Sequence, residues 1–157
     1  MENRGVKHDT GGSYPSTLDD KGRVNIPKPL RGVYNGELVV TSGLRTCVWV
    51  MRPDVGDRIH ERLMDANELT EYVRGLMELK ITASKMMMEV DQAGRIAMPP
   101  VSRRHARLTK NCLILNLENR LEVWDEELYF AYLDENRAAI EEAIGRMGSL
   151  RLFKLDT

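Results

Sequence analysis

A ten-residue pattern occurs twice in this chain. It reads LDDKGRVNIP at 18–27 and VDQAGRIAMP at 90–99. Asp, Gly, Arg and Pro recur at an offset of 72, which also carries Arg31 onto Arg103. An internal repeat of this kind constrains the architecture before any single residue does, because it means that one small unit was doubled.

Neither copy is long enough to fold well alone. The chain has 157 residues, and a unit of about 70 residues buries so little surface that its stability alone is marginal. Four short strands cannot bury both faces of their own sheet. The two copies are therefore expected to share one core, and a closed barrel would also remove exposed strand edges.

The hydrophobic periodicity gives both halves the same order: strand, turn, strand, short helix, strand, turn, strand, helix. The first half is expected to have strands at 14–19, 24–26, 38–40 and 47–51, a short helical turn at 27–31, and helices from 53 to about 64 and over about 69–79. The second half is expected to have strands at 86–90, 96–98, 112–115 and 121–124, a short helix at 99–107 and one long helix at 125–147. The closing strands 47–51 and 121–125 align at an offset of 74.

These elements set the expected boundaries. Residues 1–12 are expected to form a flexible tail, 13–82 the first repeat with its helices, 83–148 the second repeat with its C-terminal helix, and 149–157 a second tail. Apolar side chains at helical spacing in the long helices are expected to pack in the core. They are Leu69, Tyr72, Val73, Leu76 and Leu79, and then Tyr129, Leu133, Ile140, Ile144 and Met147.

The composition is that of a soluble globular protein, with 42% hydrophobic and 30% charged residues. No apolar run approaches the roughly 20 residues that cross a bilayer, and the first eight residues lack the apolar middle of a signal peptide. Cys47 and Cys112 are too few for a disulfide scaffold and lie in apolar strands. We therefore expect buried thiols and a reducing, cytoplasmic setting.

Charge is unevenly distributed although the net charge is only −1. Residues 1–31 carry +2 and residues 91–110 carry +4, so cations gather around both motifs. Residues 118–142 carry −7 and predict an acidic helix. A local positive field can attract an anion even in a neutral protein, although charge alone favours the interpretation that these are solvated faces.

The motif itself has a physical reading. Asp19 and Arg23 flank a tight turn, so they can pair across the hairpin and hold the guanidinium at a fixed angle. Lys21 lies at the tip, and Gly22 lets the backbone approach what the turn touches. An arginine held in this way suits phosphate or guanine contacts. One copy would indicate only a structural turn clamp, but two copies in matching context favour a functional one.

Enzymatic chemistry finds no support in the residue pattern. His8, His60 and His105 are scattered and lack the spacing of a metal site or a catalytic triad, and no Gly-rich phosphate loop is present. We expect no enzyme, no cofactor and no small-molecule substrate. Trp49 and Trp124 are expected in the core, at matched places in the repeat. Arg103 and Arg104 could contact DNA, or they could belong to a solvated helix end or an intersubunit ion pair.

The two Asp-x-x-Gly-Arg motifs, the Ile-Pro or Met-Pro that follows each, and the Val-Trp strands resemble the bacterial MraZ family over residues 14–147. The resemblance implies an α+β, mainly β fold in which two tandem AbrB-like units form one swapped-hairpin β-barrel with peripheral helices. It further implies a non-enzymatic, nucleoid-associated transcriptional regulator, expected to be a repressor of the division and cell-wall gene cluster. Such a protein binds direct repeats of double-stranded DNA in its own promoter and assembles into a closed ring. The candidate DNA-binding residues are Asp19, Lys21, Arg23, Lys28, Asp91 and Arg95.

This sequence departs from the family pattern at the second motif. Met98 replaces the preferred Ile, Pro100 follows Pro99, and the turn Gln92-Ala93 lacks a basic tip. The second motif is therefore the weaker candidate for direct contact, and Arg95 is expected to serve chiefly as a clamp. The alternative function is an antitoxin-like or scaffold module that dimerises through the barrel and holds a partner on its acidic helix.

Overall fold

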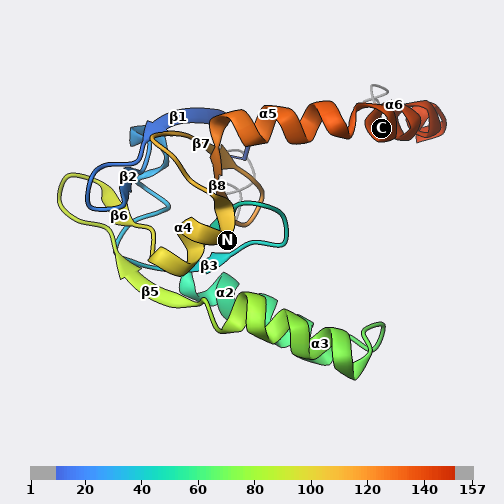
Figure 1. Ribbon diagram of the computed structural model, residues 1–157, viewed down its shortest axis with the longest axis horizontal. Coiled ribbons are helices and arrows are strands. Elements are labelled where there is room, and N and C mark those ends of the chain that lie inside the picture. The colour runs from blue at the N-terminus through green and yellow to red at the C-terminus, as the bar shows by residue number, and fades with distance from the viewer. Residues whose placement is uncertain (1–9, 151–157) are drawn as a thin grey trace, which may run out of the picture. The chain divides into compact units, whose positions relative to one another are not determined.

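The computed structural model describes residues 10–150, with side chains up to residue 148 (Figure 1). The first repeat comprises β1 (Ser13–Thr17), β2 (Arg23–Asn25), η1 (Lys28–Leu30), β3 (Glu37–Ser42), β4 (Val48–Met51), α2 (Pro53–Asp65), α3 (Glu71–Met77) and η2 (Glu78–Thr82). The second comprises β5 (Met86–Glu89), β6 (Arg95–Ala97), α4 (Pro100–Ala106), β7 (Asn111–Asn116), β8 (Leu121–Asp125), α5 (Glu126–Glu135), α6 (Arg137–Arg146) and η3 (Met147–Leu150). The fold is thus mixed α+β, mainly antiparallel, and built from two tandem repeats.

The strands pair across the repeats. One sheet has the order β1-β7-β8-β4-β3-β5, and a two-stranded ribbon pairs β2 with β6. Strand β1 of the first repeat pairs with β7 of the second, and β5 of the second pairs with β3 of the first. Each repeat therefore lends its first hairpin to the other, which confirms the expected exchange of hairpins. The strands form a six-stranded sheet and a separate ribbon rather than one continuous ladder.

The ribbon covers the inner face of the large sheet and closes the core. Val24 and Ile96 are paired at the centre of the ribbon and are 1% and 0% exposed. They share one hydrophobic cluster with the inner-face residues of the sheet, including Val40, Val50 and Ile114. Because β2 and β6 alternate inward and outward side chains, burial of Val24 and Ile96 turns their neighbours in the ribbon away from the core.

The register of the strands defines an internal two-fold relation. Thr17 pairs with Asn111 as Glu89 pairs with Glu37, so β7 follows β3 by 74 residues. Val39 pairs with Met51 and Leu113 pairs with Trp124, so the closing strands are related by 73 residues. The offset of 74 expected for these strands is wrong. It was based on similar residues in the two strands, whereas the strand pairing shows which residues are equivalent.

The corrected offset changes which residues correspond. Trp49 corresponds to Glu122, and these two residues are directly paired between β4 and β8. The expectation that Trp49 and Trp124 hold matched places is therefore wrong, although both side chains are buried as expected. The internal two-fold axis runs through the Val24–Ile96 pair on one side of the core and through the Trp49–Glu122 pair on the other.

Helix α2 begins as its sequence suggests. Pro53 occupies the first turn, where a missing N–H costs nothing, and Asp54 lies near the positive end of the helix dipole. Gly56 lets the helix approach β3 closely, since an added Cβ would lie 3.3 Å from Val39 Cγ2. The helix runs to Asp65, within a residue of its expected end.

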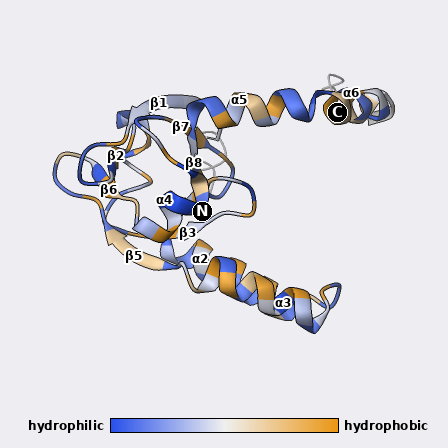
Figure 2. Cartoon of the chain, viewed as in Figure 1, coloured by the Kyte–Doolittle hydropathy of each residue, from blue (hydrophilic) through white to orange (hydrophobic). Residues whose placement is uncertain are grey.

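Helix α3 and the following η2 turn differ from expectation. Their apolar stripe was expected in the core, but Tyr72, Leu76 and Leu79 are 76%, 46% and 73% exposed. Figure 2 shows hydrophobic residues interspersed with hydrophilic ones along this segment. Helical periodicity indicates an apolar face but not what covers it, so this stripe remains open in the single chain.

The chain divides into two compact units, with the boundary between Glu126 and Glu127. In the second unit, the single long helix expected over 125–147 is replaced by α5 and α6. The break lies at Asn136, whose side-chain amide donates to the Tyr132 carbonyl at 2.8 Å. Asparagine side chains favour such local bonds to the backbone over continuing a helix.

Part of the expected N-terminal tail lies within the described residues. Gly11 N–H donates to Asn116 O and Asn116 N–H donates to Gly12 O, so residues 11 and 12 continue the pairing of β1 with β7. The expected tails at 1–9 and 151–157 lie outside the described residues. Among residues 10–150, no helix has both the length and the apolar character needed to cross a membrane.

Candidate nucleic-acid interface

The first motif forms a braced turn between β1 and β2. Asp19 N–H donates to Arg23 O at 2.9 Å, and Gly22 N–H donates to Asp19 O at 2.9 Å. The Asp19 carboxylate accepts the backbone N–H groups of Lys21 and Arg23 and the Nε–H of Arg23, each at 2.9 Å. The predicted pairing of Asp19 with Arg23 is therefore present, and it holds the backbone as well as the guanidinium.

The second motif repeats this geometry. The Asp91 carboxylate accepts the backbone N–H groups of Ala93 and Arg95 at 2.9 Å and the Arg95 Nε–H at 3.1 Å. The hydrogen bond from the Arg95 backbone holds the pKa of Asp91 below its ordinary value, and the Arg23 backbone does the same for Asp19. Both carboxylates thus stay ionised, and each anchors its arginine through a charge-assisted bond.

The two turns lie close together because β2 and β6 pair. Arg23 lies opposite Ala97, and Arg95 lies opposite Asn25. Since Val24 and Ile96 face the core, these four residues belong to the outward face of the ribbon. Arg23 Nη1 lies 3.7 Å from Asp91 Oδ2, which links the first motif to the second. One outward ribbon face therefore carries both braced guanidinium groups.

Exposure differs between the two motifs. The Arg23 side chain is 25% exposed and that of Arg95 is 37% exposed. Lys21 is exposed at the first tip, while the second tip presents Ala93 in its place. Lys28 is exposed on η1. A guanidinium has five N–H donors, and Nε is the one engaged with each aspartate, so terminal N–H groups remain to meet an acceptor.

The remaining candidates for chemistry are placed apart. His105 Nε2 lies 2.8 Å from the Arg45 carbonyl, and His8 lies outside the described residues. Among the described residues, no group of three or more His, Cys, Asp and Glu side chains is arranged to hold a metal ion. Cys47 and Cys112 are fully buried, and burial raises the pKa of both thiols, to about 11 for Cys112.

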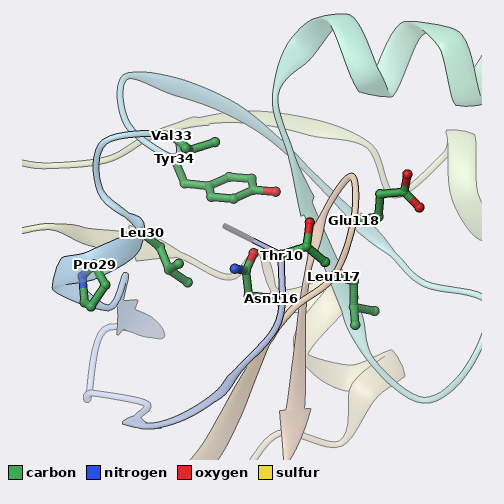
Figure 3. A pocket seen from close by; sticks show the side chains of 8 residues that line it. All are labelled: Thr10, Pro29, Leu30, Val33, Tyr34, Asn116, Leu117 and Glu118. Carbon is green, nitrogen blue, oxygen red and sulfur yellow. The ribbon is translucent and has the colours of Figure 1, made fainter. Parts of the chain in front are cut away.

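A small cavity lies between η1, with the segment that follows it, and the end of β7. Figure 3 shows Leu30, Val33 and Tyr34 on one side and Asn116 and the residues after it on the other. Its volume of about 20 Å³ has room for a single water, whereas small-molecule sites usually measure about 300–1,000 Å³.

Sequence reasoning missed a buried carboxylate on the internal axis. Glu122 is 3% exposed and accepts Trp49 Nε1–H at 3.1 Å and Trp124 Nε1–H at 3.0 Å. Arg120 donates to it through Nε at 3.1 Å and Nη2 at 2.9 Å and lies over the Trp49 ring. Burial would raise the pKa of Glu122, but these bonds outweigh it and hold the pKa below its ordinary value.

This finding corrects the expected acidic helix. Glu122 and Asp125 belong to strand β8 and are buried. Asp125 accepts hydrogen bonds from the backbone N–H and the hydroxyl of Thr109. The solvated acid lies at Glu118 before β8 and along α5 and α6, which carry two cations, Arg137 and Arg146. The acids of these two helices are Glu126, Glu127, Asp134, Glu135, Glu141 and Glu142.

The fold and the paired turns define a class: a tandem protein that exchanges hairpins between its repeats and displays two Asp-braced arginines on one outward ribbon. The family model of the MraZ protein, described as antitoxin-like, matches residues 10–71 and 82–149.

Curated relatives match along most of the chain. A protein of Treponema denticola named "Transcriptional regulator MraZ" is 33% identical over 140 residues, which is 88% of this chain and 97% of that protein. A protein of the same name from Treponema pallidum (strain Nichols) is 35% identical over 128 residues, which is 81% of this chain and 86% of that protein. The chain belongs to the MraZ family.

Proposed function

We propose that this protein is a non-enzymatic transcriptional regulator that binds double-stranded DNA through the outward face of the β2–β6 ribbon. The observation that carries the proposal is the pair of Asp-braced arginines on that face, with Lys21 exposed at one tip. The names of the two Treponema relatives support the regulatory role. The major groove of DNA admits a two-stranded ribbon, and arginine bonds guanine through two donors.

The two motifs have different roles in DNA binding. Arg23 and Lys21 form the principal contact, with Lys28 on η1 adding a charge for phosphate. The second turn lacks a basic tip, so Arg95 contacts DNA less directly and mainly braces the ribbon. Asp19 and Asp91 belong to the DNA-binding site by fixing the arginines, which reduces the entropy lost on binding.

The proposal extends to the target and the assembly. The target is a set of direct repeats in the promoter of the protein's own gene, within the division and cell-wall gene cluster, where the protein acts as a repressor in the cytoplasm at the nucleoid. Each subunit contacts few phosphates, so affinity comes from avidity within a closed ring. Exposed apolar side chains at Tyr72, Leu76 and Leu79 support self-association, since stripes of this kind mark interaction surfaces.

Arg23→Ala tests the site. We expect the affinity for DNA upstream of the protein's own gene to fall at least about fivefold per site, because a good arginine–base contact contributes about 1–3 kcal/mol. Arg58→Ala is the matched control, since Arg58 is an exposed helix arginine paired with Asp54. Native mass should be unchanged in both variants. Normal binding by Arg23→Ala would show that the site is wrong.

Salt dependence provides a second measurement. The logarithm of the affinity should fall with the logarithm of the salt concentration, with a slope of about −0.9 for each phosphate contact. An affinity that hardly changes with salt would remove the phosphate contacts from the proposal.

One observation favours a second function, an antitoxin-like or scaffold role. Within the second unit, a concave surface of about 450 Å³ is lined by Phe130, Leu133, Ile140 and Ile144 and rimmed by Asp134, Arg137 and Glu141. An apolar groove whose rim carries two carboxylates and one arginine suits an amphipathic helix with basic residues on its flank. Retention of a protein partner on the full-length chain, together with no shift of upstream DNA, would favour this role over DNA binding.

A further inference from the structure

Each motif glycine lies under an arginine of the other repeat. An added Cβ at Gly22 would lie 2.8 Å from Arg103 Cζ, and at Gly94 it would lie 2.3 Å from Arg31 Cζ. Both glycines are buried although they occupy turns. The guanidinium groups therefore cover the turn backbone so closely that no side chain fits between them.

The backbone on the far side of each glycine is also held by the other repeat. Gly22 O accepts the Met98 N–H at 2.8 Å, and Gly94 O accepts the Ile26 N–H at 2.7 Å. Each turn is thus held twice from across the repeat boundary, by a strand end and by an arginine. The two arginines are themselves related by the offset of 72 that relates the motifs.

The two arginines differ in how they are tethered. Arg31 Nε donates to Ile26 O at 2.7 Å. Arg103 Nε is buried and has no hydrogen-bond partner among the described residues. Arg31 is therefore tethered to its own repeat through Nε while it covers Gly94, whereas Arg103 covers Gly22 without such a bond at Nε.

We propose that Arg31 and Arg103 are positioning residues that act across the repeats. Arg103, from α4 of the second repeat, sets the backbone of the first turn, which presents Lys21 and Arg23. Arg31, from the end of η1 in the first repeat, sets the turn that presents Arg95. The proposal rests on DNA binding by these turns for its consequence, but the positioning itself is a property of the free protein.

The physical reason lies in the geometry of the turn. Gly22 is adjacent to Arg23 and lies within the loop closed by the Asp19 carboxylate, so a tilt of its peptide redirects the Arg23 side chain. A planar guanidinium can lie flat against a peptide, which the ammonium group of lysine cannot do. Arginine is thus suited to this position for its shape as well as for its charge.

Amide hydrogen exchange on the full-length protein tests the proposal without DNA. Arg103→Met should speed exchange in the 19–23 turn at least about tenfold by loosening it locally, and leave the 91–95 turn unchanged. Arg31→Met should do the reverse. Arg104→Met is the matched control, since Arg104 is the exposed neighbour of Arg103 on α4, and it should change neither turn.

Exchange of the β3 and β4 amides reports on global unfolding. Faster exchange in a turn is therefore taken as local loosening only in variants whose β3 and β4 amides exchange as slowly as in the wild type. Arg103→Lys and Arg31→Lys separate shape from charge, and they should loosen the turns as the methionine variants do. Unchanged turn exchange in the methionine variants, or wild-type exchange in the lysine variants, would overturn positioning by the guanidinium plane.

A DNA arm keeps the two proposals apart. Arg103→Met should weaken binding to upstream DNA more than Arg31→Met does, because the first turn carries Lys21. If the wild-type protein binds no upstream DNA, the proposed function fails while the exchange experiment still decides the positioning role. If Arg103→Lys restores DNA binding fully, Arg103 acts as a phosphate contact and the positioning proposal is wrong.

Discussion

The two motif glycines differ in what an added methyl group would displace. Both have left-handed backbones, with φ of +77° at Gly22 and +84° at Gly94. Alanine in this region costs about 1–2 kcal/mol because Cβ crowds the following carbonyl oxygen. This strain is common to both substitutions, so any difference between them comes from the arginine above each glycine.

That difference can be worked out from the contacts. The methyl group of Gly94→Ala would lie 2.3 Å from Arg31 Cζ, which forces the guanidinium away and breaks its bond to Ile26 O. A hydrogen bond from a charged donor contributes about 1.5–3 kcal/mol, so the total loss should be about 3–5 kcal/mol. Arg103 Nε has no such bond to lose, so Gly22→Ala should cost only about 1–2 kcal/mol.

Urea unfolding at one fixed protein concentration measures both variants, because self-association would otherwise change the apparent stability. Gly32→Ala is the control: an added Cβ there meets nothing within 4 Å and the residue has no positive φ. It should be neutral or stabilising by up to about 1 kcal/mol. The reasoning is refuted if Gly22→Ala costs as much as Gly94→Ala, or if both variants match the control.

Three further outcomes are expected. Glu122→Gln should lower the free energy of unfolding by about 3–5 kcal/mol, because it leaves the half-buried Arg120 guanidinium and a buried indole without a full acceptor. Since the pKa of Glu122 is lowered, its stabilisation is present above its ordinary value of 4.5 and is lost as the pH falls through the native pKa. The variant should lack this part of the acid transition. Cys47 and Cys112 should resist a thiol reagent at pH 8 until urea unfolds the chain, because their pKa values are raised. Tyr72→Ser combined with Leu79→Ser should lower the native mass if the exposed stripe drives self-association.

The braced turn could be predicted because it is local. Asp19 and Arg23 are four residues apart on either side of a glycine turn, and that spacing alone brings the carboxylate to the guanidinium. The second copy at Asp91 and Arg95 forms the same bonds, so the repeat predicted the geometry twice. Short-range spacing of this kind leaves little freedom for the tertiary structure to change.

Contacts between the repeats could not be predicted in the same way. Alternation in β1 indicates which face of a strand is buried, but it does not identify β7 as the partner. The Arg103–Gly22 contact depends on that exchange of hairpins. The signal was present, since Arg31 and Arg103 follow the repeat, but a repeat indicates equivalence rather than contact.

The apolar stripe of α3 and η2 shows a second limit. Its periodicity correctly indicates an amphipathic helix, and Tyr72 and Leu79 nevertheless face solvent in the single chain. The periodicity indicates a helix face that burial would stabilise. It does not indicate whether the surface that packs against this face belongs to the same chain. An apolar stripe read from sequence alone can therefore be assigned to the core of the chain although the chain itself leaves it exposed.

The Trp49–Glu122 pair on the internal axis is possible because both repeats belong to one chain; two identical chains could not form it. In a symmetric pair of chains, a residue on the two-fold axis faces its own copy, so a carboxylate would meet a carboxylate and an indole would meet an indole. Here Trp49 faces Glu122, and a donor meets an acceptor at 3.1 Å. Because both halves belong to one chain, the two residues that meet on the axis can differ. The tips of the two motif turns can differ for the same reason, and there Lys21 corresponds to Ala93. Divergence between the repeats therefore allows the two turns to differ at their tips, while each turn is still covered by an arginine of the other repeat.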